Sequence, residues 1–233
     1  MLVLFDIDGT LLKSQHAGMH AMLDAFHQLH PDRRFSFDGV DIAGRLDTLI
    51  YNEMTSNHGV PNDPESHDVF RQLYTTKIRS RLADCNTVIA LDGVIELVDQ
   101  LAKEPGVELG LLTGNYPDTA RIKVRHAGLD PDQFRVNAFA MDGATRRDLP
   151  PVALDRYAQR HGSPLDPARA IIIGDTPNDV DCALHNGFRS LAVATGGFPA
   201  EQLKACGAHL VVEKLSPTKP ILDWLLSHRE PTR

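Results

Sequence analysis

Two aspartates one residue apart, Asp6 and Asp8, follow the apolar segment 2–5 and precede Gly9. Side chains on a strand alternate between its faces, so the two carboxylates would lie on the same side of a regular strand. Close carboxylates repel, and each prefers to stay protonated unless a cation lies between them. Gly9 allows the backbone to turn sharply after the strand. The pair therefore predicts a site for a hard cation at the carboxyl end of a buried strand.

A second acidic group follows another apolar segment, Ile171–Ile173. Gly174 and Asp175 come directly after this segment, and Asp179 lies four residues beyond Asp175. Asp175 is a candidate ligand for the same cation, whereas Asp179 is either a ligand or a residue that holds the loop and the metal-bound waters. Helix capping is the alternative, because Asp is common just before a helix. Capping explains part of the role of Asp179. It does not explain why an aspartate, Asp175, stands at the end of the predicted strand.

Thr113, Gly114 and Asn115 follow the apolar segment that ends at Leu112. A predicted helix begins shortly after them, and a helix amino terminus offers unpaired N–H groups and a positive dipole end to an anion. The three residues are therefore a candidate phosphate cradle. Ordinary turn chemistry is the alternative, because these residue types are common in turns.

Arg146 and Arg147 lie in a loop between the two motifs just described. An enzyme that acts on phosphate needs a cation to balance the charges of the ligand and the nucleophile, and one of these arginines could reach the site. Solvated surface charge is the alternative. The carboxylates, the hydroxyl and the cation together follow the carboxyl ends of several predicted strands, which core packing alone does not require.

Short β-rich apolar segments alternate with segments of helical spacing over most of the chain, and this is typical of an α/β fold. The predicted strands are Leu2–Phe5, Glu108–Leu112, Val136–Phe139, Ala170–Ile173, Ser190–Ala194 and His209–Val212. The predicted helices among them are Val94–Lys103, Asp118–Ala127, Val152–His161, Asn178–Asn186, Ala200–Cys206 and Lys219–Ser227. Continuous apolar strands separated by helices indicate a doubly wound parallel sheet with both faces covered.

The alternation stops between about Ser14 and Cys85, where the sequence predicts helices only. The helical segments there are His16–His30, Leu46–His58 and Glu65–Leu82. The simplest interpretation is a helical domain, residues 14–85, inserted into an α/β core made of residues 1–13 and 86–233. Such an insertion would lie over the strand ends, where ligands bind in open α/β folds.

The charge and the hydropathy of the chain argue against two classes of partner. Among 233 residues, 24 Lys and Arg stand against 31 Asp and Glu, a net charge of −7, and no basic block occurs that would favour nucleic acid. No apolar segment approaches the roughly 20 residues that cross a membrane, and no signal peptide precedes Asp6. The cysteines, Cys85, Cys182 and Cys206, lie far apart and form no metal-type pair. We therefore expect a cytoplasmic protein.

The order and spacing of three motifs resemble the haloacid dehalogenase (HAD) superfamily over essentially the whole chain. The motifs are Asp6-x-Asp8-Gly9-Thr10-Leu11, Thr113-Gly114-Asn115 and Gly174-Asp175-x-x-x-Asp179. The helical insertion resembles the small cap of the phosphoglycolate-phosphatase-like branch. The resemblance implies a Rossmann-like core with a helical cap, and hydrolysis of a small phosphorylated metabolite such as phosphoglycolate.

The resemblance also implies roles for the acidic residues. Asp6 would be the nucleophile and would form an aspartyl-phosphate. Asp8 would be the general acid for the leaving oxygen and then the general base for the water that cleaves the intermediate. Mg²⁺ would be bound by Asp6, the Asp8 carbonyl and Asp175, and Asp179 would support the site, because an oxygen-only site that keeps waters suits this ion.

For the substrate, the resemblance implies contacts from the first two motifs and from the cap. The phosphoryl group would be bound by Gly9, Thr10, Thr113, Gly114 and Asn115, with Thr113 also counted among the catalytic residues. Arg45, in the insertion, would meet an anionic group of the substrate such as a carboxylate. Alternatively, Asp47 or Thr48 caps the following helix and Arg45 is solvated.

The chain departs from the family pattern in the segment between the last two of these motifs. Many relatives have Lys-Pro there, whereas no lysine occurs between Lys123 and Lys204. Either Arg146 or Arg147 must then take this role, and the distance to Leu149 and the proline after it favours Arg146. An arginine would supply a planar, bidentate clamp instead of a point charge.

Other activities on the same fold remain alternatives. Asp8 favours phosphoryl transfer over dehalogenation, which does not need a second carboxylate as proton donor. A phosphonatase would need a Schiff-base lysine in the cap, and the insertion offers only Lys77, in a predicted helix. A sugar-phosphate mutase on the same core, and a non-catalytic binding or regulatory module, stay open. We expect a monomer or a homodimer.

Overall fold

The computed structural model describes residues 1–84 and 88–229. Its centre is a five-stranded parallel sheet in the order β4-β1-β5-β6-β7. The bounds of these strands are Leu2–Phe5 for β1, Glu108–Leu111 for β4, Ala170–Gly174 for β5, Arg189–Val193 for β6 and Leu210–Val212 for β7. The strand β1 pairs with β4 on one side and β5 on the other, and all four of its residues are buried. The predicted α/β class is confirmed.

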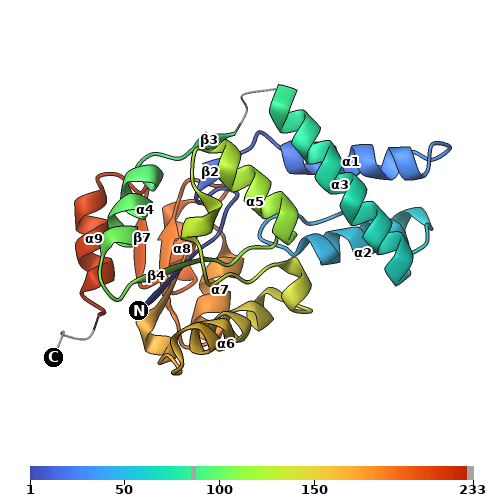
Figure 1. Ribbon diagram of the computed structural model, residues 1–233. Helices are drawn as coiled ribbons and strands as arrows, with labels where there is room; N and C mark the ends of the chain where they lie inside the picture. The colour runs from blue at the N-terminus through green and yellow to red at the C-terminus, as the bar shows by residue number, and fades with distance from the viewer. Residues whose placement is uncertain (85–87, 230–233) are drawn as a thin grey trace.

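Helices flank this sheet (Figure 1). Their bounds are Val94–Lys103 for α4, Pro117–His126 for α5, Leu149–His161 for α6, Pro177–His185 for α7, Ala200–Ala205 for α8 and Thr218–Leu226 for α9. α4 packs against α9, and α7 packs against α8 and against strands β5 and β6. Each of these helices overlaps a predicted one, and the largest difference is that α6 begins three residues early, at Leu149 instead of Val152.

The predicted strand Val136–Phe139 is wrong. Only Ala138 makes a bridge to the sheet edge, through its N–H to the carbonyl of Leu111 at 2.7 Å. The side chain of Asn137 takes the place of a backbone partner, because its Oδ1 accepts from the N–H of Leu111 at 2.8 Å and its Nδ2 donates to the carbonyl of Phe134. A side chain that bonds to the backbone in this way interrupts the ladder of a strand.

Three helices form a separate group at the right of Figure 1, and we call this group the cap. They are α1 (Ala17–Leu29), α2 (Asp47–His58) and α3 (Pro64–Asp84). The antiparallel pair of β2 (Leu12–Lys13) and β3 (Ile89–Ala90) lies where the chain leaves the core and where it returns. The three predicted helices of the insertion therefore exist. The predicted domain boundary at 85/86 lies outside the described residues, and the division at these positions stays a prediction.

The cap has an aromatic core of its own. The ring of Phe26 lies 4.5 Å from that of Phe70 and 5.8 Å from that of Tyr51, and Phe70 stacks on Tyr74 at 5.9 Å. All four side chains are almost fully buried. Aromatic pairs at such separations contribute beyond their buried area, so they hold the three helices together.

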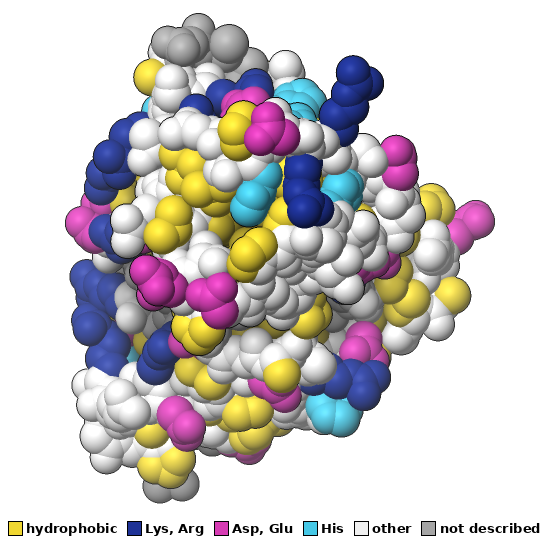
Figure 2. All heavy atoms as spheres, turned by 90° about the vertical axis from the view of Figure 1, so that its right-hand side faces the viewer, with side chains coloured by type: hydrophobic (Ala, Val, Ile, Leu, Met, Phe, Trp, Pro, Cys, Tyr) yellow, Lys and Arg dark blue, Asp and Glu magenta, His cyan; other side chains and the backbone are white. Residues whose placement is uncertain are grey.

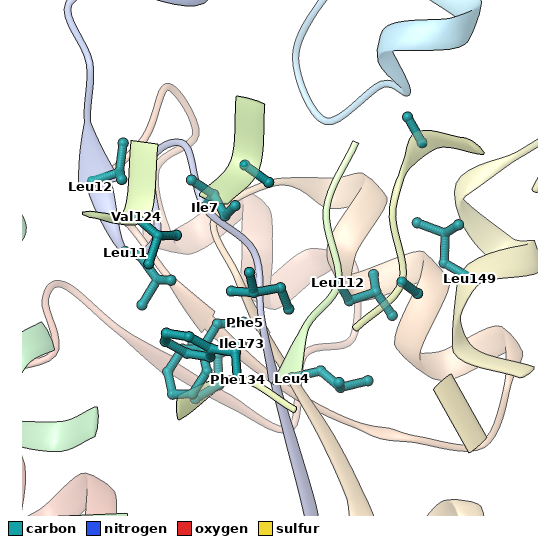
Figure 3. Packing of buried hydrophobic residues seen from close by; sticks show 14 of the residues in the cluster. Leu4, Phe5, Ile7, Leu11, Leu12, Leu112, Val124, Phe134, Leu149 and Ile173 are labelled. Atoms are coloured by element: carbon teal, nitrogen blue, oxygen red, sulfur yellow. The ribbon is translucent and has the colours of Figure 1, made fainter. Parts of the chain in front are cut away.

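The core beneath the first motif is apolar and closely packed (Figure 3). Phe5 meets Phe134 edge to face at 6.0 Å, and Leu4, Ile7 and Ile173 are fully buried around them. Because apolar contacts fix the chain on both sides of Asp6, this carboxylate is held at the end of a rigid strand.

The surface of the cap end carries charges of both signs. Figure 2 looks at this end and shows Lys and Arg side chains along its left edge, with hydrophobic side chains among the polar atoms elsewhere. None of the helices in the described part of the chain has the length and apolar composition needed to cross a membrane.

Candidate active site

The chain turns sharply after β1. Asp6 is buried there, whereas the side chain of Asp8 is 40% exposed toward the cavity. The N–H of Asp6 still pairs with the carbonyl of Ile173 at 2.9 Å, as the last bond of the sheet at this point. Gly9 then has a φ of +86°, and a Cβ there would lie 2.3 Å from Oδ2 of Asp175. A side chain at position 9 would therefore be strained and would also displace the Asp175 carboxylate.

Three buried carboxylates converge beyond this turn. Carboxylate oxygens of Asp6, Asp175 and Asp179 lie within 4.8 Å of one another. Burial raises the pKa of Asp6 above its ordinary value, Arg146 opposes the shift, and Asp179 adds to it. Burial also raises the pKa of Asp175, and the charges of Asp6 and Asp179 add to that shift. The cluster therefore holds more negative charge than its neighbours balance.

Arg146 is the cation in this cluster. Its Nη2 lies 3.0 Å from Oδ1 of Asp6 and also pairs with Asp179, and its Nη1 donates to the carbonyl of Gly44 in the cap at 3.0 Å. Only 8% of the residue is exposed. Burial lowers the pKa of Arg146, but the charges of Asp179 and Asp6 outweigh this and raise it above the ordinary value, so the guanidinium stays charged.

Arg147 does not reach the cluster. Its side chain is half exposed and makes a bidentate ion pair with Asp181, at 2.7 and 2.6 Å. Of the two arginines that the sequence left open, the structure therefore brings only Arg146 to Asp6.

Asp179 caps the helix α7, as one of the two interpretations predicted, and also pairs with Arg146. Its Oδ2 accepts from the N–H and the hydroxyl of Thr176, at 3.0 and 2.7 Å, and so closes a capping box at the start of α7. Its Oδ1 pairs with Arg146. Asp179 therefore positions both the loop after β5 and the cation.

The Thr113–Asn115 motif lies beside the first motif, as expected for neighbouring parallel strands. The N–H of Leu112 donates to the carbonyl of Phe5 at 2.8 Å, and the amide of Asn115 donates to Oδ2 of Asp8 at 3.0 Å and to Oγ1 of Thr113 at 2.9 Å. The helix α5 begins immediately afterwards, at Pro117. Its amino terminus therefore lies close behind the predicted phosphate cradle.

Thr10 contacts the acidic cluster on the side away from the cavity. It is fully buried, and its hydroxyl donates to Oδ1 of Asp175 at 2.9 Å. The structure thus gives Thr10 a contact to the predicted metal ligand Asp175.

Asp8 makes a different set of contacts from Asp6. Its carboxylate accepts from Nζ of Lys123 at 2.5 Å and from the side chains of Asn115 and Ser14, each at 3.0 Å. Burial raises the pKa of Asp8, but the charge of Lys123 and the three hydrogen bonds outweigh it, so the pKa lies below the ordinary value. Asp8 is therefore ionised in this arrangement.

Lys123 is the site residue that the sequence reasoning missed. It lies on α5, is only 4% exposed, and also donates to Oδ1 of Asn115 at 2.6 Å. One signal was available in the sequence, because Lys123 follows Thr119 and Ala120 at helical spacing on the buried face of α5. A lysine on such a face requires a partner, since a buried unpaired charge is costly.

The cap loop before α2 rests on the phosphate cradle. A Cβ on Gly114 would lie 2.0 Å from the carbonyl oxygen of Arg45, and the N–H of Asp47 donates to the carbonyl of Gly114 at 2.7 Å. Only a glycine at position 114 allows this approach.

The structure does not show the alternative in which Asp47 caps the helix α2 and Arg45 is solvated. The helix α2 has no side-chain cap, and Oδ2 of Asp47 instead accepts from the N–H of Tyr116 in the core at 3.0 Å. Burial raises the pKa of Asp47 to about 7, although Lys123 opposes the shift. Arg45 pairs with Glu53 at 2.5 Å, so its charge is already balanced.

These residues surround one cavity of about 480 Å³ between the core and the cap. The cavity is lined by the predicted residues Asp6, Asp8, Gly9, Arg45, Thr113, Gly114, Asn115, Arg146 and Asp175, and also by Lys123. Thr10 and Asp179 lie behind this lining. The tertiary structure thus places the predicted site residues in or directly behind a single cavity.

Comparisons with known proteins agree with this geometry. The sequence model of the haloacid dehalogenase-like hydrolases matches residues 1–187. A pyrophosphatase PpaX of Bacillus cereus is 22% identical over 230 residues, with 95% of both chains covered. A pyrophosphatase PpaX of Bacillus velezensis is 25% identical over 228 residues, with 92% of both chains covered.

Two solved structures share the fold. A hydrolase from Pseudomonas syringae is 22% identical, with a TM-score of 0.70, and the match covers 96% of this chain and 98% of that one. CbbY from Rhodobacter sphaeroides in complex with phosphate is 19% identical, with a TM-score of 0.72, and the match covers 93% and 95% of the two chains. At these identities the likeness establishes the fold alone.

Proposed function

Because the chain belongs to the haloacid dehalogenase-like hydrolases, we propose that it is a Mg²⁺-dependent phosphatase of small-molecule phosphate monoesters. One observation carries this proposal. Three buried carboxylates and a single buried guanidinium, that of Arg146, meet beside a cavity that also holds Asp8. Such a cluster is suited to a dianion and a divalent cation together.

The donor set fits Mg²⁺. Asp6 and Asp175 would hold the ion together with the backbone carbonyl of Asp8, and Asp179 would support them, so that all protein ligands are oxygen atoms. Burial raises the pKa of Asp6 and Asp175, and the neighbouring carboxylates add to both shifts. Such an ion would balance the negative charge of this cluster. When bound, Mg²⁺ supplies positive charge that allows a phosphate dianion to approach Asp6.

The residues of the chain would then carry two chemical steps. In the first step, an Asp6 carboxylate oxygen attacks phosphorus, the bond from phosphorus to the ester oxygen breaks, and this oxygen takes a proton from Asp8. Asp8 is ionised in the free protein. The entering phosphate dianion raises its pKa, as a nearby negative charge does, and Asp8 then takes up a proton from the solvent before the first step. In the second step Asp8 removes a proton from water, whose oxygen attacks phosphorus and releases inorganic phosphate and Asp6.

Arg146 and the cradle would hold the phosphoryl group during both steps. Nε of Arg146 is buried and has no hydrogen-bond partner among the described residues, so it is available to an oxygen of the substrate. The hydroxyl of Thr113 and the amides of Gly114 and Asn115 would bind the other oxygens. Donors placed in advance at the developing charge stabilise a transition state without reorganisation.

The proposal leaves the alcohol part of the substrate open. The resemblance to the phosphoglycolate-phosphatase-like branch makes phosphoglycolate one compound to test, and the name of the Bacillus relatives makes pyrophosphate another. A sugar-phosphate mutase would use the same core, and a non-catalytic module would use none of this chemistry.

A phosphate-release screen over a panel of phosphorylated metabolites with Mg²⁺ tests the proposal. We expect turnover that excess chelator abolishes, and that Asp6→Asn lowers by at least about a thousandfold because the nucleophile is lost. Asp181→Asn, at an exposed aspartate outside the cavity, is the matched control. Full activity in chelator or in Asp6→Asn would refute the proposal, and isomerised sugar phosphate without phosphate release would identify a mutase.

A further inference from the structure

The two ends of the cavity differ in polarity. One end is polar and is the proposed phosphate site, and the other is lined mainly by apolar side chains. The phosphate end lies against the core loops, next to Asp6 and Arg146. The other wall comes from the cap: Met19 and Met22 from α1, Phe37 and Ile42 from the following loop, Ile50 from α2 and Tyr74 from α3. Most of the lining of the whole cavity is apolar for this reason.

The charged groups around the cap wall already have partners. Arg45 is bound by Glu53 at 2.5 Å and by the carbonyl of Asp41 at 2.9 Å. Lys123 is bound by Asp8 and Asn115. Among the described residues that line the cavity, Lys13 and His16 are also basic, but both side chains are exposed at its rim, where water solvates them. The cap wall therefore offers a second anion no buried, unpaired cation.

We propose that the substrate is the phosphate monoester of an apolar, carbon-rich alcohol, aliphatic or aromatic, whose carbon chain packs against the cap wall. This inference rests on the proposed phosphatase function and narrows it. An anionic leaving group, such as a carboxylate or a second phosphate, would lose its hydration against this wall without gaining an ion pair. A carbon chain would instead gain from leaving water, by about fourfold in affinity per buried methylene.

The size of the cavity agrees with such a substrate. A volume of about 480 Å³ lies within the range of roughly 300–1,000 Å³ that is typical of small-molecule sites. The phosphoryl group occupies only the core end, so the remaining volume is available to a chain of several carbon atoms.

A series of n-alkyl phosphates provides the test, because ethyl, propyl, butyl and hexyl phosphate differ little in the reactivity of their leaving groups. With Mg²⁺ present, we expect kcat/KM to rise at least tenfold from ethyl to hexyl phosphate. n-Propyl phosphate and phosphoglycolate are similar in size but differ in charge. We expect propyl phosphate to be the better substrate by at least tenfold, and pyrophosphate to be worse than propyl phosphate.

Variants of the cap wall separate packing from general damage. Met22→Ala and Ile50→Ala should each lower the ratio of kcat/KM for hexyl over ethyl phosphate several-fold, because they remove apolar surface from the wall. Met141→Ala and Ile95→Ala are the matched controls, since these side chains are 45% and 46% exposed and do not line the cavity. Turnover of ethyl phosphate and the melting temperature report whether each variant is folded.

Glu53→Gln tests whether the lack of an unpaired cation at the cap wall disfavours anionic leaving groups. This change leaves Arg45 without its carboxylate partner and so provides a free cation at the wall. We expect the preference for propyl phosphate over phosphoglycolate to fall several-fold.

The outcomes distinguish this inference from the function on which it rests. Equal kcat/KM across the alkyl series, or a preference for phosphoglycolate or pyrophosphate over propyl phosphate, would overturn the inference and leave the phosphatase intact. Phosphate release from no ester at all would overturn the proposed function, and the inference would fall with it.

Discussion

Asp6 and Asp8 are separated by one residue but have opposite electrostatic environments. Asp6 lies in a group of carboxylates with Arg146, and burial raises its pKa. Asp8 lies against Lys123, and its pKa is lowered despite burial. Pairs of titratable groups whose pKa values are moved apart are typical of active sites with divided roles. The first carboxylate thus belongs to the acidic cluster in which we propose a cation, and the second to the proton transfer that we propose.

Substitutions of Arg146 and Arg147 test which arginine takes the role of the family's usual lysine. Arg146→Ala removes the only buried cation that contacts Asp6 in the described structure, so we expect kcat to fall by about a hundredfold or more. Arg147→Ala removes an exposed ion pair with Asp181 and should change kcat by less than about threefold, because exposed ion pairs contribute little. Steady-state kinetics with Mg²⁺ measure both, and Arg146→Lys shows how much a point charge restores. The reverse order of effects would assign the role to Arg147.

Lys123 is expected to act as a positioning residue for Asp8. Lys123→Met should raise the pKa of Asp8, since the opposing charge is lost while burial remains. The ionised base would then be reached only at higher pH, so the acidic limb of the pH profile of kcat should move upwards. Lys123→Arg, which retains the charge, and Arg121→Met, on the same helix with a side chain that is 42% exposed, are the controls. An unmoved acidic limb in Lys123→Met would contradict this role.

At the scale of elements, the ends of β1, β4 and β5 explain why distant motifs meet. These strands are neighbours in the sheet and all run in the same direction, so the residues after Phe5, Leu111 and Gly174 emerge at one edge. The cap helices then close the site from above. Their attachment is polar as well as apolar, because Asp47 in α2 bonds to the backbone at Gly114 and Tyr116.

The attachment of α2 predicts a pH-dependent stability. Asp47 has a folded-state pKa of about 7 against an ordinary value of 3.8, so the folded protein keeps a proton that the unfolded chain loses between about pH 4 and 7. The stabilisation of the folded state by this proton is complete below about pH 4 and is lost as the pH rises to about 7. Asp47→Asn remains neutral and can still accept from Tyr116.

We therefore expect Asp47→Asn to gain stability relative to the wild type as the pH rises from 4 to 7. The gain should approach about 4 kcal/mol at most, which is the value of a shift of about three pKa units. Urea unfolding at several pH values measures it. Asp41→Asn, at an exposed aspartate of the loop before α2, is the control, and a difference that does not vary with pH would disprove the burial argument.

At the scale of the whole molecule, the loop before α2 contacts the core beside the cavity at three successive residues, 43–45. The carbonyl of Gly44 accepts from Arg146, and the carbonyl of Ala43 accepts from Asn178 at 3.1 Å. A third contact places the Arg45 carbonyl directly on Gly114. Since both Arg146 and Gly114 belong to the proposed phosphate site, the position of the cap and the geometry of the site are coupled.

Gly114→Ala tests this coupling. The added methyl group would meet backbone 2.0 Å away, which cannot move aside as a flexible side chain can. We expect the cap loop to be displaced, kcat/KM to fall at least tenfold, and proteolysis of the cap to become faster. Gly197→Ala is the control, because a Cβ there meets nothing within 4 Å. Equal kinetics and equal protease resistance for the two variants would show that the cap does not rest on Gly114.

The sequence by itself determined the α/β class, most element bounds and the identity of the acidic residues. Local information suffices for these, because a continuous apolar strand and a helical spacing are visible over a few residues. The same local information failed at Val136–Phe139, where the apolar pattern was right but the side chain of Asn137 replaced the backbone ladder.

Only the tertiary structure decided which charges meet. The sequence offered two adjacent arginines, and the choice of Arg146 depends on where the loop before α6 packs against α7. The sequence indicated no chemical role for Lys123 and left two alternatives for Arg45, an anionic group of the substrate or solvent. Folding pairs Lys123 with Asp8, 115 residues away, and Arg45 with Glu53. The physical reason is that an ion pair depends on distance in space and on burial, and neither quantity is encoded at a single position of the chain.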